Sequence, residues 1–413
     1  MTELSNLLFF FEYLTQPLSF QAYSYSPTPD LVFPTRLINS TDGVSCALRE
    51  AIGLRKQERA MKPKFGSGAR PLSATNQIHL VCSSGGSRAI LGSAGAIAAL
   101  EQAGLKEFVS IGGISGGSIP TAMFAAGLGA TETLRLAVDI DFSSMLTRHG
   151  SIARILLAYI MQGRLAQTRP RKGVMSSEKL GVYLDEKVPQ WPDRYWTMAV
   201  QGDNKIFFTQ NGVFELTPSG KINVLSIKPA PIGVAIRASC AVPGIISAVP
   251  YKGRYLFDGA LTREGRCPIA LPIEHMGALP ENIIAVDAGD DDSKWSQRLT
   301  RLWGILCGGN CVPHIEEKVL TEEDVAVLVK PDLGFFRSLQ FTLTRDQKWR
   351  AVMAGYVATV KQLKKGDVLE GEQLEKMMVI VSAFQRIESM CKFSEEGVLT
   401  RLTEQLMREH KLF

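Results

Sequence analysis

The clearest pattern along the chain is a short apolar run, a glycine turn and an apolar helix, and it occurs twice. Residues 78–82 are mainly apolar and lead through serine and glycine into a helix expected at 89–102. Residues 108–111 repeat the apolar run, and a second helix is expected at 118–127. Strands that alternate with helices in this way are typical of a parallel α/β sheet.

Later apolar runs extend this sheet, and the C-terminal part changes to a helical pattern. Additional strands are predicted at 197–200, 205–209, 255–257 and 283–286. From about residue 321 the apolar positions recur at helical spacing, with long segments at 348–364 and 373–392. The C-terminal part is therefore expected to be helical.

These changes in pattern divide the chain into three regions. Residues 1–75 form an N-terminal extension that ends in a basic linker. Residues 76–320 form the α/β domain, and residues 321–413 form a helical C-terminal region. No internal repeat interrupts this division.

The composition is that of a folded protein with an ample core. Of 413 residues, 45% are hydrophobic. The chain has no run of 18 or more apolar residues, so a membrane-spanning helix is not expected. The net charge of +5 does not by itself indicate nucleic acid, because a basic surface serves anionic lipid equally well. Seven scattered cysteines indicate reduced thiols, and the N-terminus lacks the basic flank of a signal peptide. We expect a cytoplasmic protein that does not bind nucleic acid.

A candidate nucleophile stands between the second strand and the second helix. Residues 113–117 read Gly-Ile-Ser-Gly-Gly, the form that places Ser115 on a sharp strand-to-helix turn. Gly113 and Gly117 lack a Cβ and relieve crowding there, while the following helix directs N–H groups toward developing negative charge. An ordinary glycine turn is the alternative for so short a pattern, but the strand and helix around it favour a nucleophile.

A second glycine turn, before the first helix, offers a candidate oxyanion hole. Residues 84–88 read Ser-Gly-Gly-Ser-Arg, and the N–H groups of Gly85, Gly86 and Ser87 are candidate donors to an oxyanion. The spacing of a dinucleotide loop and the Gly-Lys-Ser/Thr of a phosphate loop are both absent. Arg88 is either a structural arginine or a residue that holds a phosphate or braces the loop.

A candidate base follows one of the later predicted strands. Asp258 is followed at once by Gly-Ala, which fits a loop-borne base as well as a common Asp-Gly turn. The order of residues also allows a triad with His275, His314 or His410, although none of these lies in a recognisable loop after a strand. A dyad of Ser115 and Asp258 needs no histidine.

The order of these motifs resembles the patatin-like phospholipases. The glycine loop at 84–88 is followed by the Gly-x-Ser-x-Gly at 113–117 and then by the Asp-Gly-Ala at 258–260. The segment at 238–243, Ala-Ser-Cys-Ala-Val-Pro, is similar to that family's Ala-Ser-x-Ala-x-Pro. The resemblance covers residues 78–288, about half of the chain.

Two departures bring the glycine loop closer to the cytosolic phospholipase A2 branch of the same superfamily. Ser84 and Ala89 stand at the first and last glycines of the usual Gly-Gly-Gly-x-Arg-Gly. The run at 88–95 is closer in register to that branch, which also uses a Ser–Asp dyad and an arginine in its glycine loop. The chain is too short for the full architecture of that branch, with its extra lipid-binding domain.

The resemblance implies a three-layer α/β/α sandwich with a mainly parallel sheet, and a serine acyl hydrolase that needs no metal or cofactor. It implies these roles: nucleophile Ser115, base Asp258, oxyanion donors Gly85, Gly86 and Ser87, and Arg88 for the glycine loop or the lipid phosphate. The implied partner is phospholipid or a membrane surface, with an activating protein left open. A nonspecific lipid or lysophospholipid esterase and an inactive membrane-docking module are the alternatives.

Three segments outside these motifs are candidates for other roles. Residues 148–172 contain six basic and no acidic residues, with apolar positions at helical spacing. This pattern fits a segment that docks on a membrane surface or forms a lid, and it fits equally well a core-facing helix with a solvated basic face. Residues 298–306 are a weaker candidate for membrane docking. The cysteines and histidine at 307–314 are loosely spaced for zinc, and the three aspartates at 290–292 fit a solvated loop better than a calcium site.

Overall fold

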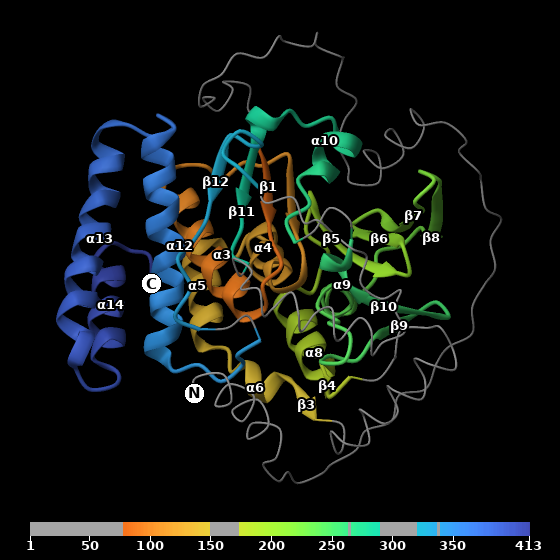
Figure 1. The fold of residues 1–413 in the computed structure, drawn as a ribbon, viewed down its shortest axis with the longest axis horizontal. Helices are drawn as coiled ribbons and strands as arrows, with labels where there is room; N and C mark the ends of the chain where they lie inside the picture. The colour runs from red at the N-terminus through yellow and green to blue at the C-terminus, as the bar shows by residue number, and fades with distance from the viewer. Residues whose placement is uncertain (1–76, 149–172, 263–265, 290–319, 337–338) are drawn as a thin grey trace, which may run out of the picture.

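The computed structural model describes residues 77–148, 173–262, 266–289, 320–336 and 339–413, which form an α/β/α fold (Figure 1). In these residues ten strands join one sheet, and five of them run parallel in the order β12-β11-β1-β2-β5. The parallel strands are β1 (His79–Cys82), β2 (Ser110–Gly113), β5 (Tyr195–Gln201), β11 (Ile283–Val286) and β12 (Val327–Val329). Their side chains are almost all buried, as expected for strands covered by helices on both faces.

An antiparallel part continues the sheet beyond β5. The meander consists of β6 (Asn204–Thr209), β7 (Gly212–Leu216) and β8 (Ile222–Ser226). Two further strands, β9 (Val249–Tyr251) and β10 (Arg254–Asp258), form a hairpin, and β10 pairs with β5. A separate ribbon joins β3 (Thr147–Arg148) to β4 (Met175–Ser176).

Helices cover both faces of the sheet. On one face lie α3 (Gly86–Gln102), α4 (Ser118–Ala125), α5 (Gly129–Asp139), α8 (Glu178–Lys187) and α9 (Ile232–Ser239), with the short α6 (Phe142–Met145) beside them. Leu80 and Ile111 pack into this layer. On the other face Val81, Trp196 and Ile283 pack against α10 (Ala270–Met276). Alternate residues of β1 thus enter opposite cores, which is the expected consequence of the strand's period of two.

The C-terminal helices stack outside the first layer. They are α12 (Arg345–Lys365), α13 (Gly371–Met390) and α14 (Val398–Glu409), drawn in blue in Figure 1. A Thr344–Gln347 capping box starts α12. The helix then packs closely on α3, because a Cβ on Gly95 would lie 1.8 Å from the carbonyl oxygen of Val352. Within the described part of the chain, no helix is both long and apolar enough to cross a membrane.

The fold class expected from the sequence, with a mainly parallel sheet and a helical C-terminal part, is confirmed. All four later strands predicted from apolar runs are present, in β5, β6, β10 and β11. The strands β7 and β8 carried no such prediction, and β12 lies where helix was expected from about residue 321. Val-Leu-Val is too short a run for its period to separate a buried strand from a helix. The boundaries at 75/76 and 320/321 stay predictions.

Candidate active site

Ser115 lies on a strained turn directly after β2. Its φ is +51°, a left-handed value that a residue with a side chain adopts rarely. A 3₁₀ turn over Ser115–Gly117 follows and continues into α4. A Cβ on Gly116 would lie 2.1 Å from the carbonyl oxygen of Gly86, and one on Gly117 would lie 2.4 Å from that of Ser83. The glycines therefore allow this turn to pack directly on the first glycine turn.

Two serine hydroxyls hold the backbone of Ser115. The N–H of Ser115 donates to Oγ of Ser239 at 2.9 Å, and Oγ of Ser118 donates to the carbonyl oxygen of Ser115 at 2.5 Å. Both serines are fully buried. Buried backbone groups are costly when they lack a partner, so these bonds stabilise a backbone conformation that is otherwise unfavourable.

Asp258 meets the hydroxyl of Ser115. Oγ of Ser115 donates to Oδ2 of Asp258 at 2.7 Å, and the N–H of Ala260 donates to Oδ1 at 2.9 Å. Ser115 is 5% exposed and Asp258 is 3% exposed. Burial raises the pKa of Asp258 from 3.8 to about 6, while the two hydrogen bonds oppose this rise. A carboxylate with such a pKa is a stronger base than an ordinary aspartate near neutral pH.

The sheet explains how residues so distant in sequence meet. Strand β2 pairs with β5 up to Gly113 opposite Thr197, and β6 occupies the other edge of β5. The antiparallel β10 reaches the same edge as β2 from the opposite direction and ends with Asp258 opposite Ala199. The ends of β2 and β10 therefore point at each other along β5. Ser115, just after β2, and Asp258, the last residue of β10, meet there.

The first glycine turn lies beside the Ser115 turn. Gly85 and Gly86 have φ values of +149° and +56°, and α3 begins at Gly86. The first N–H groups of a helix have no acceptor within it, and such groups commonly bind anions. The hydroxyl of Ser87 donates to the carbonyl oxygen of Gln340 at 2.8 Å, and Arg88 is buried within α3 at 5% exposure. The structure thus brings Gly86 of the predicted turn against Gly116, beside Ser115.

The described histidines lie on other elements than Ser115 and Asp258. His79 is buried in β1, where its Nδ1 lies 2.8 Å from Oγ of Ser110, and burial lowers its pKa to about 4. His275 lies in the last turn of α10, and His410 follows α14. None of these three hydrogen-bonds to Ser115 or Asp258. His149 and His314 lie outside the described residues.

Sequence reasoning assigned no role to three residues that contact this turn. They are Ser118, Ser239 and Cys240. The Cys240 thiol lies 3.9 Å from Oγ of Ser118, and burial raises its pKa, so it stays protonated. Ser239 and Cys240 belong to the Ala-Ser-x-Ala-x-Pro segment, which was the only available signal. Nothing in that segment tells which side chain turns toward Ser115.

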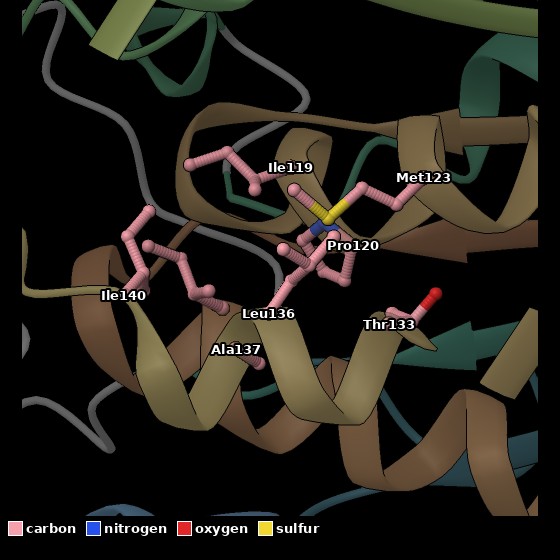
Figure 2. A pocket seen from close by; sticks show the side chains of 8 residues that line it. Ile119, Pro120, Met123, Thr133, Leu136, Ala137 and Ile140 are labelled. Carbon is pink, nitrogen blue, oxygen red and sulfur yellow. The ribbon is translucent and has the colours of Figure 1, made fainter. Parts of the chain in front are cut away.

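A small apolar cavity lies between α4 and α5, the two helices that follow the Ser115 turn in the chain (Figure 2). Its volume is about 10 Å³, room for about one water molecule. An acyl chain does not fit this space. The lining residues are Ile90, Ile119, Pro120, Met123, Thr133, Leu136, Ala137 and Ile140.

The structure leaves the candidate docking segments and the two segments considered for metal binding untested. The docking segments at 149–172 and 298–306 lie outside the described residues, as do the aspartates at 290–292 and the cysteines near 307. Among the residues that are described, no three histidine, cysteine or acidic side chains gather as a metal site would require.

Comparison with known proteins gives a family match over the site. A family model described as patatin-like phospholipase matches residues 80–271, a span that includes Ser115 and Asp258. No curated protein matches the chain.

Several solved structures are similar at low identity. VipD from Legionella pneumophila has 13% identity and a TM-score of 0.41, with 87% of this chain and 85% of that chain covered. Human GIVD cytosolic phospholipase A2 has 13% identity and a TM-score of 0.36. The match covers 81% of this chain and only 62% of the human one. The type III effector ExoU has 15% identity and a TM-score of 0.33, with 82% and 69% covered.

Proposed function

Since the chain carries a patatin-like phospholipase domain over residues 80–271, we propose that it is a serine acyl hydrolase that cleaves acyl esters of phospholipids. The observation that carries this proposal is the 2.7 Å hydrogen bond from Oγ of Ser115 to the buried carboxylate of Asp258. Hydrolysis of lipid acyl esters is the function of the family. Beyond this, we propose phospholipid as the substrate and Ser115 and Asp258 as the catalytic residues.

In the first half of the reaction, Asp258 removes the hydroxyl proton of Ser115 as Oγ attacks the ester carbonyl carbon. The carbonyl oxygen becomes an oxyanion, which the N–H groups of Gly85, Gly86 and Ser87 stabilise. When the tetrahedral intermediate collapses, its bond to the alcohol oxygen breaks, and Asp258 returns the proton to that oxygen. The products are the free alcohol and an acyl-Ser115 ester.

In the second half, Asp258 acts as base toward water. Water loses a proton to the carboxylate and attacks the acyl carbonyl, and the same N–H groups stabilise the second oxyanion. Collapse breaks the bond to Oγ of Ser115, which takes the proton back from Asp258. The fatty acid leaves, and the dyad is restored. The raised pKa of Asp258 suits both directions of proton transfer near neutral pH.

Arg88 and the membrane surface complete the proposal. Arg88 follows the glycine turn within α3, and we assign it to bracing that turn or to the lipid phosphate. Since phospholipids reside in bilayers, the protein acts as a peripheral enzyme at a cytoplasmic membrane surface, with the basic segment at 148–172 as its proposed contact.

The test is fatty acid release by the purified protein. Wild type should release fatty acid from diacyl phospholipid vesicles and hydrolyse a soluble short-chain chromogenic ester, and Ser115→Ala should do neither. A wild type that cleaves neither substrate but sediments with vesicles would instead be the membrane-docking module. Equal rates on phospholipid, lysophospholipid and simple esters would favour the nonspecific esterase.

A further inference from the structure

A buried ion pair lies close to the first glycine turn. Nε of Arg266 lies 3.0 Å from Oδ1 of Asp287, and Nη2 donates to Oδ2 at 3.2 Å. The Asp287 side chain is 2% exposed and that of Arg266 is 16% exposed. Two parallel contacts of this kind fix the relative orientation of both side chains.

The pair connects two loops of the site. Arg266 follows the loop that starts at Asp258, and Asp287 comes directly after β11. The Arg266 side chain crosses Gly289 so closely that a Cβ there would lie 2.5 Å from Cδ of Arg266. The segment after β11 and the segment after Asp258 are thereby locked together.

The glycine turn is hydrogen-bonded to both of these segments. The N–H of Ser84 donates to the carbonyl oxygen of Arg266 at 2.8 Å. On the other segment, the N–H of Ala288 donates to Oγ of Ser83 at 2.9 Å, and a Cβ on Gly85 would lie 3.0 Å from the carbonyl oxygen of Ala288. The turn is therefore seated between the two segments that the ion pair joins.

We propose that Arg266 and Asp287 are positioning residues that set the direction of the oxyanion-stabilising N–H groups at Gly85 and Gly86. This inference rests on the proposed function. Without the bidentate pair, the carbonyl oxygen of Arg266 is no longer held in one position, and the N–H of Ser84 that donates to it shifts as well. The next two N–H groups then no longer meet the oxyanion at the distance that stabilises it.

The experiment compares a soluble ester with the thionoester of the same acyl and leaving groups. A thiocarbonyl sulfur accepts hydrogen bonds poorly, so the rate ratio of ester to thionoester measures how much the oxyanion donors contribute. Loss of the base would slow both substrates, whereas misplaced N–H donors slow mainly the ester. A purely structural role would leave the ratio unchanged.

Arg266→Lys should lower kcat on the ester about tenfold to a hundredfold, with KM changed less than about threefold. Its ester-to-thionoester ratio should contract about tenfold. The isosteric Asp287→Asn should contract the ratio in the same direction and serves if Arg266→Lys does not fold. Lengthening the acid in the Arg266→Lys/Asp287→Glu double variant should restore part of the ratio.

A matched control is a second arginine–carboxylate pair, between β10 and β7 of the sheet. Arg254, at the start of β10, contacts Glu215 on β7, and the Glu215 side chain is 4% exposed. Arg254→Lys should keep the wild-type ratio, whatever its effect on the thermal midpoint. A wild-type ratio in folded Arg266→Lys or Asp287→Asn would overturn the inference alone. A wild type inactive on both substrates would overturn the proposed function, and this inference with it.

Discussion

Two buried acids on the same sheet have opposite electrostatic environments. Asp258 and Glu215 are both 3% exposed. Burial raises the pKa of Asp258 to about 6, because only the Ser115 hydroxyl and one backbone N–H oppose it. Burial acts on Glu215 in the same direction, but hydrogen bonds from Arg254, Asn223 and Asn204 outweigh it and leave its pKa below the ordinary value.

Asp258 lies deeper in the protein than Glu215, and the two carboxylates also differ in their donors. Glu215 accepts from Asn204 at 2.8 Å and from Asn223 at 2.9 Å, and it also pairs with Arg254. Such a carboxylate stays ionised and joins strands. Asp258 has no cation among the causes of its pKa shift, so it can take a proton near neutral pH. The first arrangement favours stability, and the second favours proton transfer at a cost in stability.

The largest expected effect is on kcat, which substitution of Asp258 should lower far more than substitution of Glu215. Ser115→Ala and Asp258→Asn should each lower kcat on a soluble ester by about a thousandfold or more, because they remove the nucleophile or its base. Glu215→Gln should stay within about threefold of wild type, since that side chain touches no reacting atom. Steady-state kinetics on folded variants is the measurement. A large loss of kcat in Glu215→Gln, with none in Asp258→Asn, would show that Glu215 and not Asp258 serves the reaction.

Histidine replacements provide the control for a dyad. His275→Ala, His314→Ala and His410→Ala should each keep at least about a tenth of the wild-type rate, because a Ser–Asp dyad uses no imidazole. A collapse of turnover in one of them would indicate a Ser–Asp–His triad.

The support of the Ser115 turn should have the next largest effect. Ser239→Ala removes the acceptor of the Ser115 N–H and should lower kcat about tenfold to a hundredfold with little change in KM. Thr133→Ala is its control, because it removes a buried hydroxyl that donates to the carbonyl oxygen of Gly129 within α5. Equal turnover in the two variants would show that the Ser239 bond does not position the nucleophile.

The pH dependence of kcat/KM should show a smaller difference between Asp258 and Glu215. Because Asp258 must be ionised to accept the proton, kcat/KM should fall about tenfold per pH unit below the pKa of about 6. Glu215→Gln should show the same midpoint as wild type. A profile that stays flat down to pH 4.5 would mean that Asp258 has an ordinary pKa or is not the base.

The smallest expected effect is on stability, and its sign differs between the two acids. An acid with a raised folded pKa binds more protons when folded than when unfolded between pH 3.8 and about 6, so stability falls as pH rises through this window. Asp258→Asn should therefore raise the free energy of unfolding at pH 7 by roughly 1–3 kcal/mol, and the gain should vanish below about pH 4.

Glu215→Gln should act in the opposite direction. The lowered pKa of Glu215 stabilises the fold above its unfolded value of 4.5, and this contribution is lost as the pH falls through the folded pKa. We expect a loss of roughly 1–3 kcal/mol at pH 7, measured by urea unfolding. Two losses of the same sign would contradict the assignment of Asp258 as a destabilised base.

The sequence predicted the parts of the site that depend on local pattern. The turns at Gly85 and Ser115 and the loop at Asp258 each follow a strand, and their residue types limit the possible chemistry. The pairing of Ser115 with Asp258 came from a resemblance to a family. Local pattern alone does not show that β10 approaches β2 end to end along β5.

The contacts that support the site were beyond prediction because they join distant segments. Ser239 reaches a turn 124 residues away, and Ser87 bonds to Gln340 across 253 residues. The Arg266–Asp287 pair and the close packing of α12 on α3 depend likewise on how the layers meet. A lone serine or arginine carries no periodic signal, so only the assembled fold shows its partner.

The central claim is that Asp258 activates Ser115 as a nucleophile, and covalent labelling tests it most directly. An alkyl fluorophosphonate reacts with activated serines, and peptide mass spectrometry locates the adduct. We predict a single adduct on Ser115, none on the Ser115→Ala variant, and labelling at least about a hundredfold slower in Asp258→Asn. An adduct on another residue, or a wild-type labelling rate in Asp258→Asn, would contradict the claim.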